Sequence, residues 1–164
     1  MRLQPLLPKK TVRKLNESLV ICSILRAGIP LHQGLLHVFD RSENAFVSAY
    51  RRHSENDESF EIVTNYAAAP NLNEKTLILA DPMLAAGQSI MSTLQALSAF
   101  GTPKHIHIVS IIGSKRGVDF ISNYLPKNVH LWIGDIDPVL NDKSYIVPGH
   151  GDAGDLSFGE KLNE

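Results

Sequence analysis

Four short apolar runs, rich in valine and isoleucine, divide the chain and predict its central sheet. They are residues 19–25, 76–80, 106–112 and 129–136. Runs of this length, without alternation between apolar and polar positions, are typical of strands buried on both faces of a parallel sheet. We therefore expect the chain to fold around such a sheet.

Segments with helical spacing of their apolar residues lie between these runs. Residues 30–39, 87–100 and 114–125 each place their apolar side chains on one face, and Gly101 and Pro126 follow as helix-ending residues. Regular alternation of strands and helices predicts an α/β domain with a doubly wound, mostly parallel sheet.

Two stretches break this alternation. Residues 45–50 and 60–65 resemble strands on either side of the polar stretch 51–59, which predicts a β-hairpin arm with a mobile, charged tip. Residues 144–159 contain four glycines and no period, which predicts a loop. A loop of this length in a compact domain is usually functional.

The composition narrows the class of protein. With 164 residues, 43% of them hydrophobic, and a net charge of −1, the chain is suited to one folded domain and gives no reason to expect nucleic acid as partner. No apolar run approaches the length of a membrane span. The single cysteine, Cys22, excludes a disulfide framework and favours a reducing compartment, so we expect a cytoplasmic protein.

The first residues differ in character from the rest. Residues 1–14 carry five basic side chains and no acidic one, and two prolines discourage regular structure there. We interpret residues 1–18 as a solvated, basic lead-in and residues 19–164 as the folded domain. A polyanion-binding arm is the alternative.

The most informative stretch runs from Asp81 to Ser89. It follows an apolar run and precedes a predicted helix, so its small residues would present free backbone N–H groups at a helix N-terminus. Such an end can bind a phosphate without a lysine, and Ser89 could add a hydroxyl. Asp81 would suit sugar hydroxyls or a bridging Mg²⁺. An ordinary helix cap is the alternative interpretation.

This stretch also resembles a known sequence motif. It is similar to the phosphoribosyl-diphosphate loop of the type I phosphoribosyltransferases, in the form found in the uracil phosphoribosyltransferases. Other segments match the same family in the family's order, and the resemblance covers residues 19–159. The matching segments are DPMLAAGQS (81–89), ILRAG (24–28), Tyr50 with Arg51, and YIVPGHGDAGDLSFG (145–159).

The resemblance implies an enzyme that transfers a phosphoribosyl group from 5-phosphoribosyl 1-diphosphate (PRPP) to uracil, giving UMP and diphosphate. It implies Arg51, Asp81 and Asp152 as catalytic residues, and main chain of the terminal loop as the uracil site, at Ile146, Gly151, Asp152 and Ala153. Mg²⁺ would arrive with PRPP and have no direct protein ligand, the chain would form a homo-oligomer, and GTP binding is a further expectation. The implied PRPP-binding residues are Arg26, Arg51, Asp81, Pro82, Met83, Leu84, Ala85, Ala86, Gly87, Gln88, Ser89 and Asp152.

Two positions of the motif depart from the family pattern. Ala86 stands where the family usually has threonine, and Gln88 stands where it has glycine. A lost hydroxyl contact to a phosphate weakens binding by a factor of about ten to a hundred, and a left-handed backbone at Gln88 would add strain. The stretch before Leu19 is also shorter than the family's N-terminal helices. The alternative hypothesis is therefore a weakened or inactive relative that binds UMP or uracil as a sensor.

Other polar residues invite weaker interpretations. His105, His107 and His130 alternate along two predicted strands, but no carboxylate or cysteine cluster accompanies them, so we expect no metal role. Asp135 and Asp137 end a predicted strand near the expected site, where they could support it.

Overall fold

The strand at the centre of the fold is β1 (Leu19–Leu25), and six of its seven residues are buried. The computed structural model describes residues 17–53 and 60–161, and of residues 49–53 and 60–65 it describes the backbone alone. β1 lies between two parallel neighbours, with Cys22 opposite Ala45 on one side and Leu79 on the other. Its apolar sequence follows from this position, because both faces and both edges are covered.

In the described part of the chain, β1 belongs to a seven-stranded sheet in the order β3-β2-β1-β4-β6-β5, with β7 on the free edge of β6. All pairings are parallel except that of β2 with β3. The strands are β2 (Glu43–His53), β3 (Phe60–Ala68), β4 (Thr76–Ala80), β5 (Met83–Leu84), β6 (His105–Ser114) and β7 (Val129–Asp137).

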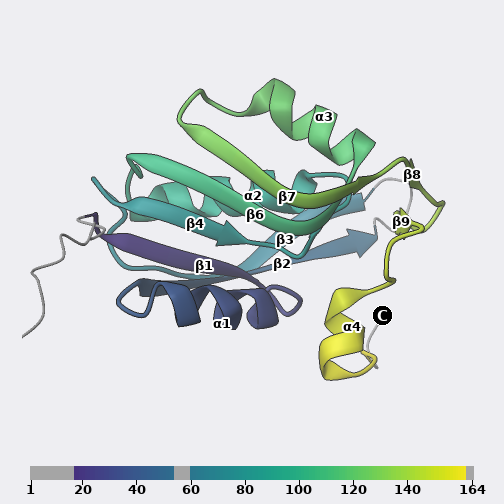
Figure 1. Cartoon of the computed structure of the whole chain (residues 1–164), viewed down its shortest axis with the longest axis horizontal. Helices are drawn as coiled ribbons and strands as arrows, with labels where there is room; N and C mark the ends of the chain where they lie inside the picture. Colours follow the sequence, from purple (N-terminus) through teal and green to yellow (C-terminus); the bar gives the residue numbers. More distant parts are fainter. Residues whose placement is uncertain (1–16, 54–59, 162–164) are drawn as a thin grey trace, which may run out of the picture.

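Helices cover the two faces of the sheet (Figure 1). The helices between the strands are α1 (Ile29–Val38), α2 (Gln88–Leu97, followed by the 3₁₀ turn Ser98–Phe100) and α3 (Lys115–Tyr124). Val20, Cys22 and Ile24 share a core with α2 and α3, whereas Leu19 and Ile21 pack toward α1. This alternation along one strand explains why β1 needs an apolar side chain at nearly every position.

The doubly wound α/β fold predicted from the sequence is confirmed. The bounds of β1 and β4 match the predicted runs, and the hairpin arm is present as β2 and β3. Of its expected tip at 51–59, residues 51–53 continue β2, and 54–59 lie outside the described residues. Cys22 is a buried core residue, and burial raises the pKa of its thiol to about 12. Within the described ranges, no helix combines the length and apolarity that crossing a membrane requires.

The prediction of an unstructured loop at 144–159 is wrong in part. A two-stranded antiparallel ladder of β8 (Val139–Leu140) and β9 (Ile146–Val147) leads into it, and a short helix, α4 (Ala153–Phe158), forms its second half. Six residues are too few to show a helical period. The signal that could have revealed α4 is the spacing of Asp152 and Asp155, an N-cap residue followed three positions later by an acid.

Over β6 and β7, no described helix covers the sheet face on which α1 packs. α1 lies over β1 and β4, but Ile111 on β6 and Trp132 on β7 are 51% and 58% exposed. The parallel register of β6 and β7 places these two side chains on the same face of the sheet.

The start of α3 fixes the segment that leads into α2. The Ser114 hydroxyl donates a hydrogen bond to the Ala85 carbonyl oxygen (2.5 Å) and accepts one from the Gly117 amide (2.9 Å). A Cβ atom on Gly117 would lie 2.2 Å from the same Ala85 oxygen. The close approach of these two segments therefore depends on a residue without a side chain at 117.

We expect Gly117→Ala to destabilise the fold, because the added methyl group must push Ala85 or α3 aside. Overpacking of this kind costs about 1–3 kcal/mol. Gly34→Ala is the matched control, since a Cβ at Gly34 of α1 meets nothing within 4 Å. Alanine is the better helix former, so Gly34→Ala should raise stability by about 0.5–1 kcal/mol. Thermal unfolding of both variants checks this; an unchanged melting temperature for Gly117→Ala would contradict it.

Candidate active site

The carboxyl ends of β1, β2, β4 and β6 lie along one edge of the sheet, and α4 sits beside that edge (Figure 1). Ligands of open α/β sheets bind at this edge, where the loops after the strands meet. The segments singled out around Arg26 and Asp81 follow the ends of β1 and β4, Arg51 lies on β2, and the terminal segment follows β7 and β8.

The loop after β4 is fastened to β6 by its main chain. The Asp81 amide donates to the Val109 carbonyl oxygen (3.1 Å), and the Pro82 carbonyl oxygen accepts from the amides of Ile111 (3.0 Å) and Ile112 (3.1 Å). With the Ser114 bond to Ala85, these contacts hold the loop in one conformation before α2 begins.

No side chain caps the N-terminus of α2. Gly87 precedes the helix with φ 81°, and the first helical hydrogen bond runs from the Met91 amide to the Gly87 carbonyl oxygen (3.2 Å). The amides of Gln88, Ser89 and Ile90 lack intrahelical partners, as in any first turn. This arrangement can accept an anion, because those donors and the helix dipole point the same way.

The left-handed residue of this loop is Gly87 and not Gln88. Gln88 is the first residue of α2 and is not among the residues of the described chain that have a positive φ. The backbone strain considered for Gln88 from the sequence therefore does not arise. Ala86 is half-buried and has no hydroxyl to offer.

Asp81 is a buried carboxyl group at the end of β4, with 9% of its surface exposed. Burial raises its pKa from 3.8 to about 7, and a long contact from the Met83 amide (3.4 Å) opposes this rise only weakly. Among the described side chains no cation pairs with it. The group is therefore poised to gain from a cation or from hydroxyl donors brought by a ligand.

The loop after β1 lies directly beside Asp81. A Cβ atom on Gly28 would stand 2.6 Å from the Ala80 carbonyl oxygen, at the residue that precedes Asp81. Arg26 is two residues earlier in this loop, so the matched segments 24–28 and 81–89 are neighbours. Arg51 lies on β2, three residues beyond Ser48, which pairs with Leu25 at the end of β1. Its backbone thus extends roughly 10 Å past that strand end, and its side chain lies outside the described part.

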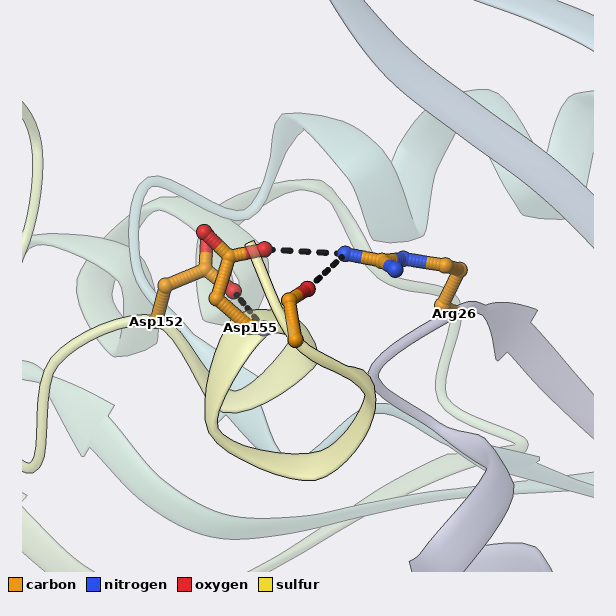
Figure 2. A network of polar contacts seen from close by, with 4 residues as sticks. Arg26, Asp152 and Asp155 are labelled. Atoms are coloured by element: carbon orange, nitrogen blue, oxygen red, sulfur yellow. Dashed lines mark hydrogen bonds and ion pairs between the residues drawn. The ribbon is translucent and has the colours of Figure 1, made fainter. Parts of the chain in front are cut away.

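Arg26 contacts the terminal segment. Its Nη2 donates to Asp155 Oδ1 (2.8 Å) and to the Gly159 carbonyl oxygen (3.2 Å), and its guanidinium carbon lies 5.9 Å from the centre of the Phe158 ring. Figure 2 shows Arg26 reaching toward α4, with Asp152 and Asp155 on the facing side. Sequence reasoning missed both Asp155 and Phe158 as neighbours of Arg26.

The terminal segment is shaped by two aspartates. Asp152 Oδ1 accepts the Asp155 amide (3.0 Å) and caps α4, while Asp137 Oδ2 at the end of β7 accepts the Gly149 amide (3.0 Å). The supporting role considered for Asp137 thus has a specific contact, whereas Asp135 accepts a hydrogen bond from the amide of its neighbour Ile136 (2.8 Å).

The residues expected to hold uracil differ in exposure. Ile146 and Ala153 are buried, whereas Gly151 is exposed, has φ 82° and has no heavy atom within 4 Å of where its Cβ would be. This segment therefore offers exposed main chain beside open space at Gly151, between the ladder at Ile146 and the helix at Ala153.

Three histidines lie on the uncovered sheet face, away from these loops. His107 and His130 stack at 5.1 Å, and Trp132 Nε1 donates to His107 Nδ1 (3.0 Å). Burial and the neighbouring histidines lower the pKa of His107. In the described ranges, no three histidine, cysteine or acidic side chains gather as a metal site would require.

Comparison with known proteins gives concordant matches. The family model described as "Uracil phosphoribosyltransferase" matches residues 3–160. A uracil phosphoribosyltransferase of Porphyromonas gingivalis is 51% identical over 147 residues, which are 90% of this chain and 68% of that protein. One of Pyrococcus furiosus is 40% identical over 148 residues, 90% of this chain and 62% of that protein. The chain thus spans about two thirds of the length of these relatives.

Solved structures agree at the level of the fold. The AQ2163 protein from Aquifex aeolicus superposes with a TM-score of 0.80 at 33% identity, over 91% of this chain and 69% of that one. A hypoxanthine phosphoribosyltransferase from Staphylococcus aureus superposes with a TM-score of 0.57 at 16% identity, over 76% of this chain and 65% of that one, which shows a shared fold alone. Because the family model matches nearly the whole sequence and relatives of that family are up to half identical, this chain belongs to the uracil phosphoribosyltransferase family.

Proposed function

We propose that this chain transfers the phosphoribosyl group of PRPP to uracil, releasing diphosphate and forming UMP. Family membership supports the reaction. The observation that carries the proposal is the meeting, at one sheet edge, of an uncapped helix N-terminus, a buried aspartate, an arginine and an exposed glycine-containing main chain. Each of these groups suits a different part of the two substrates.

The 5′-phosphate of PRPP would bind the turn from Ala85 to Ser89. The free amides at the start of α2 would donate to its oxygens, and the Ser89 hydroxyl would add a further donor. Contacts of Pro82 and Ala85 with β6 and α3 make this turn rigid before the ligand arrives. Pro82, Met83, Leu84, Ala86, Gly87 and Gln88 would contribute main chain and shape.

Asp81 would bind the ribose hydroxyls. A hydroxyl that donates a hydrogen bond to this carboxylate replaces part of the solvation that burial removes. Binding of the sugar would therefore stabilise the charged form of Asp81. Asp152, at the start of α4, would contact PRPP from the opposite side.

The diphosphate of PRPP would lie between the arginines. Breaking the bond at the anomeric carbon leaves positive charge on the ribose ring and negative charge on the departing diphosphate. Guanidinium groups suit this anion because they stay charged and can bond it with two N–H groups. Arg26 is at the site already, and Arg51 would approach from the hairpin arm, where closure would exclude water.

The described carboxylates fit Mg²⁺ that is brought by PRPP. Asp81 is buried and no described side chain places a cation beside it, and no cluster in the same ranges supplies a full set of protein ligands. Bound to the diphosphate, Mg²⁺ would neutralise part of the charge that develops on the leaving group.

Uracil would bind along the main chain of the terminal segment. One edge of uracil presents an acceptor, a donor and an acceptor, which main-chain N–H, C=O and N–H groups complement. The exposed, open backbone at Gly151 supports this placement, with Ile146 and Ala153 on either side. Cytosine would set its amino donor against a backbone N–H, and such a mismatch leaves buried donors unpaired.

The proposed enzyme works in the cytoplasm as a homo-oligomer. The free thiol of the buried Cys22 is in keeping with a reducing compartment, and the uncovered sheet face at Ile111 and Trp132 offers apolar surface for another copy.

The first test is turnover. Purified protein should release diphosphate and form UMP only when uracil, PRPP and Mg²⁺ are all present, and cytosine should not replace uracil. Arg26→Ala should lower kcat/KM for PRPP by at least tenfold, because a charged contact to the diphosphate is lost. Folded protein that binds UMP in calorimetry yet never turns over would contradict the proposal and favour a ligand sensor.

The two departures in the loop should respond differently to reversal. Ala86→Thr supplies a hydroxyl beside the phosphate and should lower the KM for PRPP by roughly tenfold or more. Gln88→Gly should bring no gain, because Gln88 is helical and carries no left-handed strain to relieve. Steady-state kinetics of both variants against PRPP checks this. An improvement from Gln88→Gly alone would contradict the loop geometry.

The buried carboxylate of Asp81 should lower the stability of the ligand-free fold while being required for activity. Its pKa is 3.8 in the unfolded chain and about 7 in the fold, so the folded state holds the extra proton and its stability falls as pH rises between these values. Asp81→Asn removes the ionisation. Without ligand, the melting temperature of Asp81→Asn minus that of wild type should therefore be more positive at pH 8 than at pH 5, by roughly 5 °C. The activity of the variant should drop.

The control for this experiment is Asp40→Asn, which changes an exposed carboxyl group. Its melting temperature relative to wild type should be the same at both pH values. An equal offset at both pH values for Asp81→Asn would show that burial of its charge does not limit the stability of the fold.

A further inference from the structure

Arg26 is held at one nitrogen of its guanidinium group. Its contacts with described residues, to Asp155 Oδ1 (2.8 Å) and to the Gly159 carbonyl oxygen (3.2 Å), both use Nη2. Figure 2 shows both contacts leaving the same nitrogen, on the side that faces α4. The direction of the guanidinium plane is therefore set by the terminal segment.

The Nε donor of Arg26 is not paired in the way that Nη2 is. Nε is buried and has no hydrogen-bond partner among the described residues, although a guanidinium group carries five N–H donors. An unpaired buried donor is costly, and an anionic oxygen would satisfy it best. The Nε–H of Arg26 is thus prepared for an oxygen-rich anion.

Asp155 belongs to the segment that also carries the proposed uracil site. It follows Gly154, whose Cβ position lies 3.9 Å from the main chain of Ala27, and its own amide is capped by Asp152. The ion pair thus joins the loop after β1 to α4, which are 129 residues apart in the sequence.

We propose that Asp155 is a positioning residue, which turns Arg26 so that its Nε–H faces the diphosphate of PRPP. This inference rests on the proposed function, and it adds a residue that contacts neither substrate.

A purely structural role makes a different prediction. If the ion pair only fastened α4 to the domain, its loss would disturb the uracil segment at least as much as the PRPP site. The side chains of Arg26 and Asp155 are 36% and 35% exposed, and ion pairs this accessible contribute little to stability. The two substrates therefore distinguish the roles.

The test compares Asp155→Asn with Asp155→Glu and with Asp119→Asn, which breaks the exposed Lys115–Asp119 ion pair as a matched control. Asp155→Asn should raise the KM for PRPP about tenfold, as expected for a weakened charged contact, and should change the KM for uracil and the melting temperature little. Asp155→Glu should recover part of the loss, and Asp119→Asn should behave like wild type. Equal increases in both KM values would overturn the inference.

A double-mutant cycle tests whether Asp155 acts through Arg26. In the Arg26→Ala background, Asp155→Asn should bring no further loss of kcat/KM for PRPP, because the side chain that it aims is gone. The same tenfold loss in both backgrounds would assign Asp155 a direct or merely structural role, and would overturn the inference.

Binding of inorganic diphosphate separates this inference from the proposed function. In calorimetry with Mg²⁺, Asp155→Asn should weaken diphosphate binding about tenfold, whether or not the wild type turns over. Wild type that makes no UMP but shows this weakening would refute the proposed reaction and keep the positioning role. Tighter or unchanged diphosphate binding in Asp155→Asn, or none in wild type, would overturn the positioning role.

Discussion

The parallel pairing of β1 with β4 is the constraint on which the site depends. Leu19 pairs with Thr76 and Ser23 with Ala80, so the two strands end side by side and their loops must leave the sheet at the same place. Both strands are buried almost throughout, and a slip in register would place apolar side chains in the wrong layer. The core therefore fixes the distance between the loop of Arg26 and the loop of Asp81 before any ligand is present.

Burial at this junction creates the chemistry. Asp81 is buried in the core, although its carboxylate form would be better solvated by water, and no cation in the described chain neutralises that charge. Arg26 likewise has one paired nitrogen, Nη2, and one buried donor, Nε, without a partner in the described part of the chain. Both groups lack these partners in the ligand-free protein. A ligand with hydroxyl and phosphate groups can donate hydrogen bonds to the Asp81 carboxylate and accept one from Arg26. Functional sites commonly hold such locally unfavourable groups, which the rest of the fold must support.

The sequence predicts the parts of this structure that depend on local pattern. The bounds of β1 and β4 follow from uninterrupted apolar runs, and the turn before α2 follows from small residues between a strand and a helix. α4 was missed because six residues show no period, although Asp152 and Asp155 have the spacing of a capped helix. The contact between Arg26 and Asp155 has no local signal at all, because it exists only once the sheet has placed two distant loops together. The same holds for Ser114 and Gly117, whose importance lies in the oxygen of Ala85.

The position of α4 near the end of the described chain has a consequence for biosynthesis. A ribosome releases the strands and the turn before α2 long before it has made residues 153–158. A nascent chain can therefore complete its sheet while Arg26 still lacks the partner that lies 129 residues further on. Contacts of such long sequence separation form late and slowly. A chain that has completed the sheet but not yet residues 153–158 would therefore hold Arg26 without Asp155 to orient it.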